Sequence, residues 1–175
     1  MPIGSRDEIW KAAYQTMYES GYNELFADNI MLRWQRFDDG TKVVVAVTTA
    51  GSSTAAGLAI WSLPVFKQVW IVLAAAGVVF ALASTALRAP DRLKAWANSK
   101  QEFGALYVEL ETFMFRMKID PEFSVVEFGK EFENYRTRYG AAKQRIPNDW
   151  LATDQLGNRS QDDLNKRINR STISL

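Results

Sequence analysis

Two long runs of uncharged, mostly apolar residues dominate the first half of the chain. They extend from Val43 to Phe66 and from Gln68 to Leu87, and Lys67 is the single charge between them. A helix rises about 1.5 Å per residue, so roughly 20 apolar residues cross a hydrocarbon core of about 30 Å. The pattern therefore predicts a two-helix transmembrane hairpin over residues 42–88.

Hydroxyl side chains interrupt the first run and form a stripe within an arc of about 140° on a helical wheel. The stripe consists of Thr48, Thr49, Ser52 and Ser53. Hydroxyls are expected to face water or another helix rather than lipid. The small-residue spacing from Ser53 to Gly57 also lets helices approach closely. The stripe and Gly57 are thus candidates for a pore lining or a helix-packing seam, and the pattern does not choose between these two.

Small residues in the second run recur on one side of the expected helix. This second-span seam comprises Ala74, Gly77, Ala81 and Ser84. Larger apolar residues such as Val72 and Val79 occupy other positions, which is typical of a helix that anchors a protein in lipid and packs through its small side chains.

Positive charges flank the hairpin and predict its orientation. Lys and Arg residues lie before the first run and after the second, whereas only Lys67 lies between the runs. Because Lys and Arg near a span are retained on the cytoplasmic side, both termini are expected in the cytoplasm of a multi-pass inner-membrane protein. No cleavable signal peptide is predicted in the first forty residues, which are polar and aromatic.

A long helix with seven-residue spacing is expected from Asp91 to Lys118. Its apolar face is the candidate oligomer or docking face, formed by Trp96, Phe103, Tyr107, Leu110, Met114 and Met117. This face is predicted either to fold back on the next helix or to pair between subunits. Asp120-Pro121-Glu122 is expected to open that next helix and Pro147 to end it, which gives a cytoplasmic helical pair over 89–147.

The remaining segments are also predicted to be helical. In the N-terminal cytoplasmic segment, 1–41, one helix is expected from Arg6 to Ser20 and another from Asn23 to Phe37, divided at Gly21 and ended by Asp38-Asp39-Gly40. The polar segment 148–175 is interpreted as a mobile or peripheral tail, with one short helix capped by Ser160. No strand-like alternation appears, so the expected class is all-α.

Composition argues against catalysis. The sequence contains no histidine and no cysteine, which removes the commonest general base, the thiolate nucleophile and most zinc ligands. We therefore predict that the protein is not an enzyme and has no metal site or cofactor. With 21 Lys plus Arg against 20 Asp plus Glu, the chain is close to neutral and has no footprint for nucleic acid.

The order of these parts resembles the SLATT family of two-transmembrane proteins. The resemblance covers about residues 6–145. It lies in the acidic, aromatic N-terminal helix, the Arg33-Trp34-x-x-Phe37 approach, the tight hairpin and the long helix that begins after Arg88-Ala89-Pro90-Asp91-Arg92. Members of that family are associated with nucleotide-signalling and other antiviral conflict systems of bacteria. They are thought to act as membrane-disrupting effectors.

The resemblance implies a small effector that is a homo-oligomer in the lipid bilayer and permeabilises the inner membrane on an upstream signal. That signal would be a cytoplasmic partner or a nucleotide-derived molecule. Two alternatives remain open on the sequence. One is a structural or adaptor membrane protein whose heptad helix docks a cytoplasmic partner, and the other is a soluble helical bundle that buries both runs.

Overall fold

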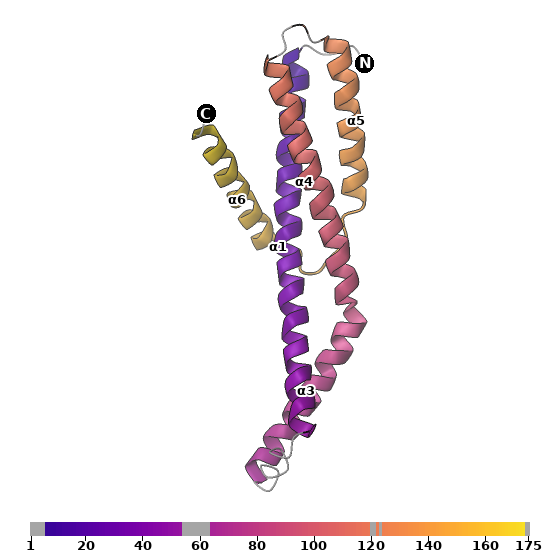
Figure 1. The fold of residues 1–175 in the computed structure, drawn as a ribbon, viewed down its shortest axis with the longest axis vertical. Coiled ribbons are helices and arrows are strands. Elements are labelled where there is room, and N and C mark those ends of the chain that lie inside the picture. The colour runs from indigo at the N-terminus through magenta and orange to yellow at the C-terminus, as the bar shows by residue number, and fades with distance from the viewer. Residues whose placement is uncertain (1–5, 54–63, 120–121, 123, 174–175) are drawn as a thin grey trace. The chain divides into compact units, whose positions relative to one another are not determined.

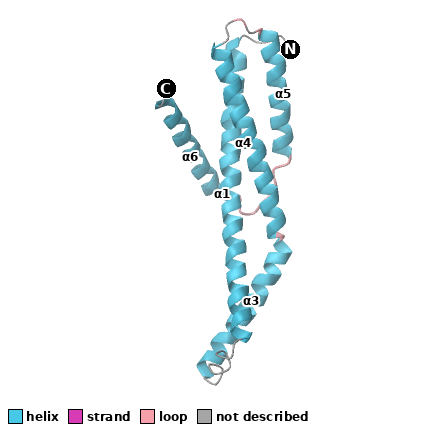
Figure 2. Ribbon diagram, in the orientation of Figure 1, coloured by secondary structure: helices cyan, strands magenta, loops and turns pink. Residues whose placement is uncertain are grey.

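The described part of the chain is entirely helical apart from short connections. A computed structural model describes residues 6–53, 64–119, 122 and 124–173. These residues form five α-helices and no strand (Figure 2), which confirms the expected all-α class. The helices are α1 Arg6–Ser53, α3 Pro64–Leu87, α4 Ala89–Ile119, α5 Val125–Gln144 and α6 Asp154–Ile173.

The chain divides into two compact units. One unit comprises Met1–Met31 together with Lys94–Leu175, and the other comprises Leu32–Leu93. The first unit therefore joins the beginning of α1 to most of α4, to α5 and to α6. The second unit contains the rest of α1 and all of α3, and so includes the described part of the expected hairpin.

The expected division of the N-terminal segment into two helices is wrong, because α1 runs without a break from Arg6 to Ser53. Gly21 is buried inside α1, and packing there compensates for the helix cost of glycine, about 1 kcal/mol. At Asp38-Asp39-Gly40, the Lys42 ammonium lies 2.6 Å from the Asp38 carboxylate one turn away. Thr41 donates a hydrogen bond of 2.8 Å to the Phe37 carbonyl. Packing at Gly21 and local interactions near Gly40 thus keep α1 continuous at both expected breaks.

A single residue separates α3 from α4. Arg88 has φ 49°, in the left-handed region that few non-glycine residues adopt. Its carbonyl accepts the Arg92 N–H at 3.0 Å, and Pro90 lies in the first turn of α4, where a missing N–H costs no helical hydrogen bond. α4 therefore begins at Ala89, two residues before the start at Asp91 that the seven-residue spacing predicts.

The helical pair expected over 89–147 consists of α4 and α5, which lie side by side (Figure 1). The second helix begins at Val125, after Ser124 in an extended conformation, rather than directly after Pro121. Three ion pairs join the two helices along one edge. These are Glu102–Arg145, Glu109–Arg138 and Arg116–Glu131.

These ion pairs follow one antiparallel register, because each step of seven residues forward in α4 corresponds to a step of seven back in α5. In the first two pairs α4 supplies the carboxylate, whereas in the third pair α4 supplies the cation. A slip of the pairing by one heptad in one direction would place Arg116 opposite Arg138, and in the other direction Glu109 opposite Glu131. Exposed ion pairs each contribute only about 0.2–1 kcal/mol, so their main effect here is to disfavour those slipped registers.

The segment expected as a peripheral tail is instead a packed helix. α6 extends from Asp154 to Ile173, and Leu156, Ser160 and Leu164 are all buried. Ser160 lies inside the helix and donates a hydrogen bond of 2.9 Å to the Leu156 carbonyl, so its expected role as an N-cap is wrong. Although the segment is mostly polar, its buried residues recur every four positions and form a narrow face on one side of the helix.

Candidate functional site

The hydroxyl stripe of the first run falls at the end of α1. The helix includes Thr48, Thr49, Ser52 and Ser53, but their side chains, together with Gly57, lie outside the described residues. A helical backbone at these positions agrees with the wheel from which the stripe was inferred. Whether the stripe lines a pore or a seam stays a prediction.

The small-residue seam of the second run is partly described. On α3, Gly77 is buried and Ala81 is half-buried, whereas the side chains of Ala74 and Ser84 lie outside the described residues. The two described members are four residues apart and so share one side of the helix. Large apolar side chains on α3 are exposed, namely Ile71, Val72, Val78, Val79, Phe80 and Leu82.

Within the described residues, no helix has both the length and the apolar character needed to cross a membrane. The same part of the chain holds no group of three or more potential metal-ligating side chains.

The heptad face of α4 lies inside the chain's own helical core. All six of its residues are buried: Trp96, Phe103, Tyr107, Leu110, Met114 and Met117. Most of them form one apolar cluster with Ile9, Ala13 and Met17 of α1, Phe128 and Phe132 of α5, and Leu164 of α6. Phe103 belongs to a second cluster with Leu106 and Ala142. Of the two alternatives for this face, folding back on the next helix agrees with the structure, because other helices of the same chain cover the face.

A buried hydrogen bond fixes the connection between α5 and α6. The Trp96 Nε1–H donates to Asp149 Oδ2 at 2.8 Å, and both side chains are buried. The other carboxylate oxygen accepts the Leu151 N–H at 3.0 Å. Because an unpaired carboxylate is costly inside a protein, this pair specifies where the chain leaves α5 and turns toward α6.

A polar cluster joins α1 to α5. The Tyr139 hydroxyl donates to Glu19 Oε2 at 2.7 Å, and Gln15 donates to the other carboxylate oxygen at 3.0 Å. The bond from Tyr139 lowers the pKa of Glu19 below its ordinary value, against the opposing effect of burial. Burial, followed by the bond to Glu19, raises the pKa of Tyr139. Glu19 is therefore held as a carboxylate that accepts hydrogen bonds, and Tyr139 is held protonated.

The seam between α1 and α6 depends on small residues. A Cβ at Gly21 would lie 2.8 Å from Tyr107 Cδ2 and 2.9 Å from Leu164 Cδ1, so this glycine lets three helices meet closely. Around this contact, Arg167 of α6 bonds Glu24 at 2.8 Å and its guanidinium lies 4.5 Å from the centre of the Tyr107 ring. In the sequence, Gly21 favours a helix break and so gives no signal for this seam.

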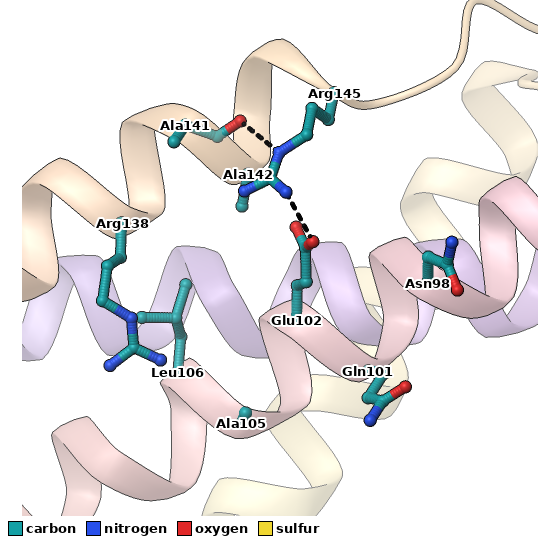
Figure 3. A pocket seen from close by; sticks show the side chains of 9 residues that line it. All are labelled: Asn98, Gln101, Glu102, Ala105, Leu106, Arg138, Ala141, Ala142 and Arg145. Atoms are coloured by element: carbon teal, nitrogen blue, oxygen red, sulfur yellow. Dashed lines mark hydrogen bonds and ion pairs between the residues drawn. The ribbon is translucent and has the colours of Figure 1, made fainter.

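An open groove of about 480 Å³ lies between α4 and α5 (Figure 3). Its lining residues are Asn98, Gln101, Glu102, Ala105, Leu106, Arg138, Ala141, Ala142 and Arg145. The Arg145 guanidinium bonds Glu102 at 2.8 Å and the Ala141 carbonyl at 3.1 Å, and Arg138 is paired with Glu109. Both cations are thus held by carboxylates of α4, and the groove is part of the ion-paired edge that joins the helix pair.

The groove was not predicted above, although the sequence contains a signal for it. Glu102 and Glu109 are seven residues apart on α4, and Arg138 and Arg145 are seven residues apart on α5. Matching heptad spacings of opposite charge in two successive helices indicate an antiparallel pair.

Comparisons of this chain with protein-family models, with curated proteins and with solved structures find no match.

Proposed function

We propose that this protein is a small inner-membrane effector. Its hairpin, residues 42–88, inserts in the bilayer, and its assembly into oligomers permeabilises the membrane when an upstream signal arrives, as part of antiviral defence. The observation that carries the proposal is the row of exposed apolar side chains on α3.

That row extends over three turns of the helix, from Ile71 to Leu82, and includes Val72, Val78 and Val79. A helix that packs on a water-soluble core turns such side chains inward, and contiguous exposed apolar surface marks contact with lipid or another protein. The sequence carries no charge from Gln68 to Leu87. The uncharged sequence of the second run and the exposed apolar side chains of α3 thus support the same assignment.

The rest of the chain has the character of a folded cytoplasmic body. The unit formed by the start of α1 with α4, α5 and α6 has an aromatic core and ion pairs at its surface. Its heptad face is already used in that core, so it is not required for holding the hairpin in lipid. We assign anchoring and permeabilisation to the hairpin, and reception of the signal to the helical body.

Membrane topology is tested first. The chain has no cysteine, so one introduced cysteine gives one site of labelling. In Phe66→Cys, an impermeant thiol reagent applied to intact spheroplasts should label the protein, because the loop is expected on the outer side of the inner membrane. In Ala95→Cys, labelling should require permeabilised membranes. Labelling of Ala95→Cys alone would overturn the topology, and protein found only in the soluble fraction would overturn insertion.

Permeabilisation is tested with a variant of the stripe. Changing its four hydroxyl residues to Val or Ala makes the first run a better transmembrane segment, so loss of activity could not be assigned to failed insertion. Dye influx and loss of membrane potential on overexpression should then fall several-fold, with the protein still in the membrane fraction. Thr137→Val, at an exposed position on α5, is the matched control and should keep full activity.

Full permeabilisation by the stripe variant would show that the stripe is neither pore nor seam. Should the unmodified protein insert but leave the membrane intact under every activating condition, the proposal of an effector fails. An anchored adaptor would then account for the topology.

A further inference from the structure

Helix α4 carries a second apolar stripe on the side opposite its buried heptad face. Val108, Phe115 and Ile119 are exposed to 54%, 59% and 60% respectively. On a wheel of 100° per residue, they lie within about 40° of one another and about 160° from Leu110, which is fully buried. Thr112, also exposed, completes the row between them. We call these four residues the outer stripe.

The outer stripe differs from scattered surface apolar residues, which are normal in soluble proteins. Its spacing of seven and four residues is that of a helix-pairing seam, and it extends over about 16 Å along α4. A helix that is apolar on two opposite sides needs a partner on each. The inner side of α4 has its partners in the core, formed by α1, α5 and α6.

We propose that the outer stripe is the surface through which α4 pairs in parallel with α4 of a second copy of this chain. In a parallel pair, charges that flank the seam meet between the helices at an offset of five residues. Glu111 flanks the outer stripe on one side and Arg116, five residues later, flanks it on the other. Glu111 of one copy would therefore meet Arg116 of the other, twice in a symmetric dimer.

Arg116 can take part in this contact without giving up its place in the fold. Its Nη1 and Nη2 lie 3.1 and 3.0 Å from the two carboxylate oxygens of Glu131, and 44% of its side chain is exposed. A guanidinium carries five N–H donors, which lets one Arg side chain bind more than one acceptor. The charge arrangement of the outer stripe thus complements itself in a second copy.

The parallel direction rests on the proposed function. α4 begins directly after α3, so a parallel pair keeps both hairpins at the same end, where one bilayer can hold them. An antiparallel pair would instead bring Glu111 near Lys118 of the other copy and would separate the hairpins. The heptad face expected to mediate subunit association is buried, so the copies would associate through the outer stripe instead.

Disulfide cross-linking of the full-length protein tests the pairing, because the chain has no cysteine of its own. Separate Val108→Cys and Phe115→Cys variants, oxidised in isolated membranes, should each run mainly as cross-linked dimers. Lys130→Cys, at an exposed position on α5, is the matched control and should remain monomeric. Dimer yields no higher than that of the control would overturn the inference.

Direction and charge are tested in the same assay. If a mixture of Val108→Cys and Ile119→Cys gives mostly mixed dimers, and neither variant cross-links to itself, the parallel direction is overturned. Adding Glu111→Lys to Phe115→Cys should reduce the dimer yield several-fold, and an unchanged yield would contradict the charge pairing. Cross-linking does not depend on permeabilisation. If the cysteine variants form cross-linked dimers but the protein causes no dye influx, the proposed function fails and the pairing stands. If the variants form no cross-linked dimers, the pairing through the outer stripe fails.

Discussion

The close contact at Gly21 allows a stability difference to be predicted with its sign. Gly21 is buried in α1, where an added Cβ would lie 2.8 Å from the Tyr107 ring and 2.9 Å from Leu164. Tyr107 is 5% exposed and Leu164 is 0% exposed, so neither side chain has free space into which it can move. The change Gly21→Ala therefore forces extra volume into a packed seam among three helices.

Two effects of this change oppose each other. Replacing an interior helical glycine with alanine favours the folded state by about 1 kcal/mol through helix propensity. Overpacking of a buried site typically costs about 1–3 kcal/mol. Gly140→Ala on α5 provides the control, because nothing lies within 4 Å of a Cβ at that position. Helix propensity is common to both variants and cancels in their difference, which isolates the packing cost of about 1–3 kcal/mol.

Urea unfolding of the full-length protein in a mild detergent, followed by circular dichroism, measures both variants. Gly140→Ala should raise the free energy of unfolding by about 1 kcal/mol. Gly21→Ala should leave it unchanged or lower it, and limited proteolysis should then cleave α6 faster than in the unmodified protein. If both variants are stabilised equally, the helices at Gly21 are not in close contact and the reasoning is refuted.

Two further predictions concern hydrogen bonds between side chains that are distant in the sequence. Trp96→Phe removes a donor from the buried Asp149 carboxylate and should lower the free energy of unfolding by about 1–3 kcal/mol, whereas Trp150→Phe at an exposed position should change it by less than about 0.5 kcal/mol. The bond from Tyr139 lowers the pKa of Glu19, so it contributes stability above the ordinary value of 4.5 that is lost as the pH falls through the folded-state pKa. Unfolding measured between pH 3 and 7 should therefore depend less on pH in Tyr139→Phe, and an equal dependence would show that the bond does not hold Glu19 ionised.

The sequence by itself determined the helical class and the long heptad helix. Its heptad face, from Trp96 to Met117, is buried as a face of that spacing should be. Local chemistry also agrees with the junction before α4, because Pro90 is tolerated in the first turn of a helix but disrupts a helix interior. These features depend on interactions between residues a few positions apart, which a sequence displays directly. The opposite charges of Glu102 and Arg145 are also consistent with the register of the helix pair. That register became clear only from the ion pair between them in the structure.

Only the tertiary structure decided what the heptad face contacts, how far α1 extends and where the last segment packs. Gly21 has the local character of a helix breaker, yet Tyr107 and Leu164, far away in the sequence, make it the residue that fits there. Leu156 and Leu164 are few among polar neighbours, and Leu164 is buried in a cluster with residues of α1 and α4 that lie far away in the sequence. Helix propensity acts over a few residues and changes the stability of a helix by about 1 kcal/mol per residue. Burial of an apolar side chain against distant helices stabilises the folded state by several times more. Tertiary packing therefore overrides the local pattern at the positions where the two disagree.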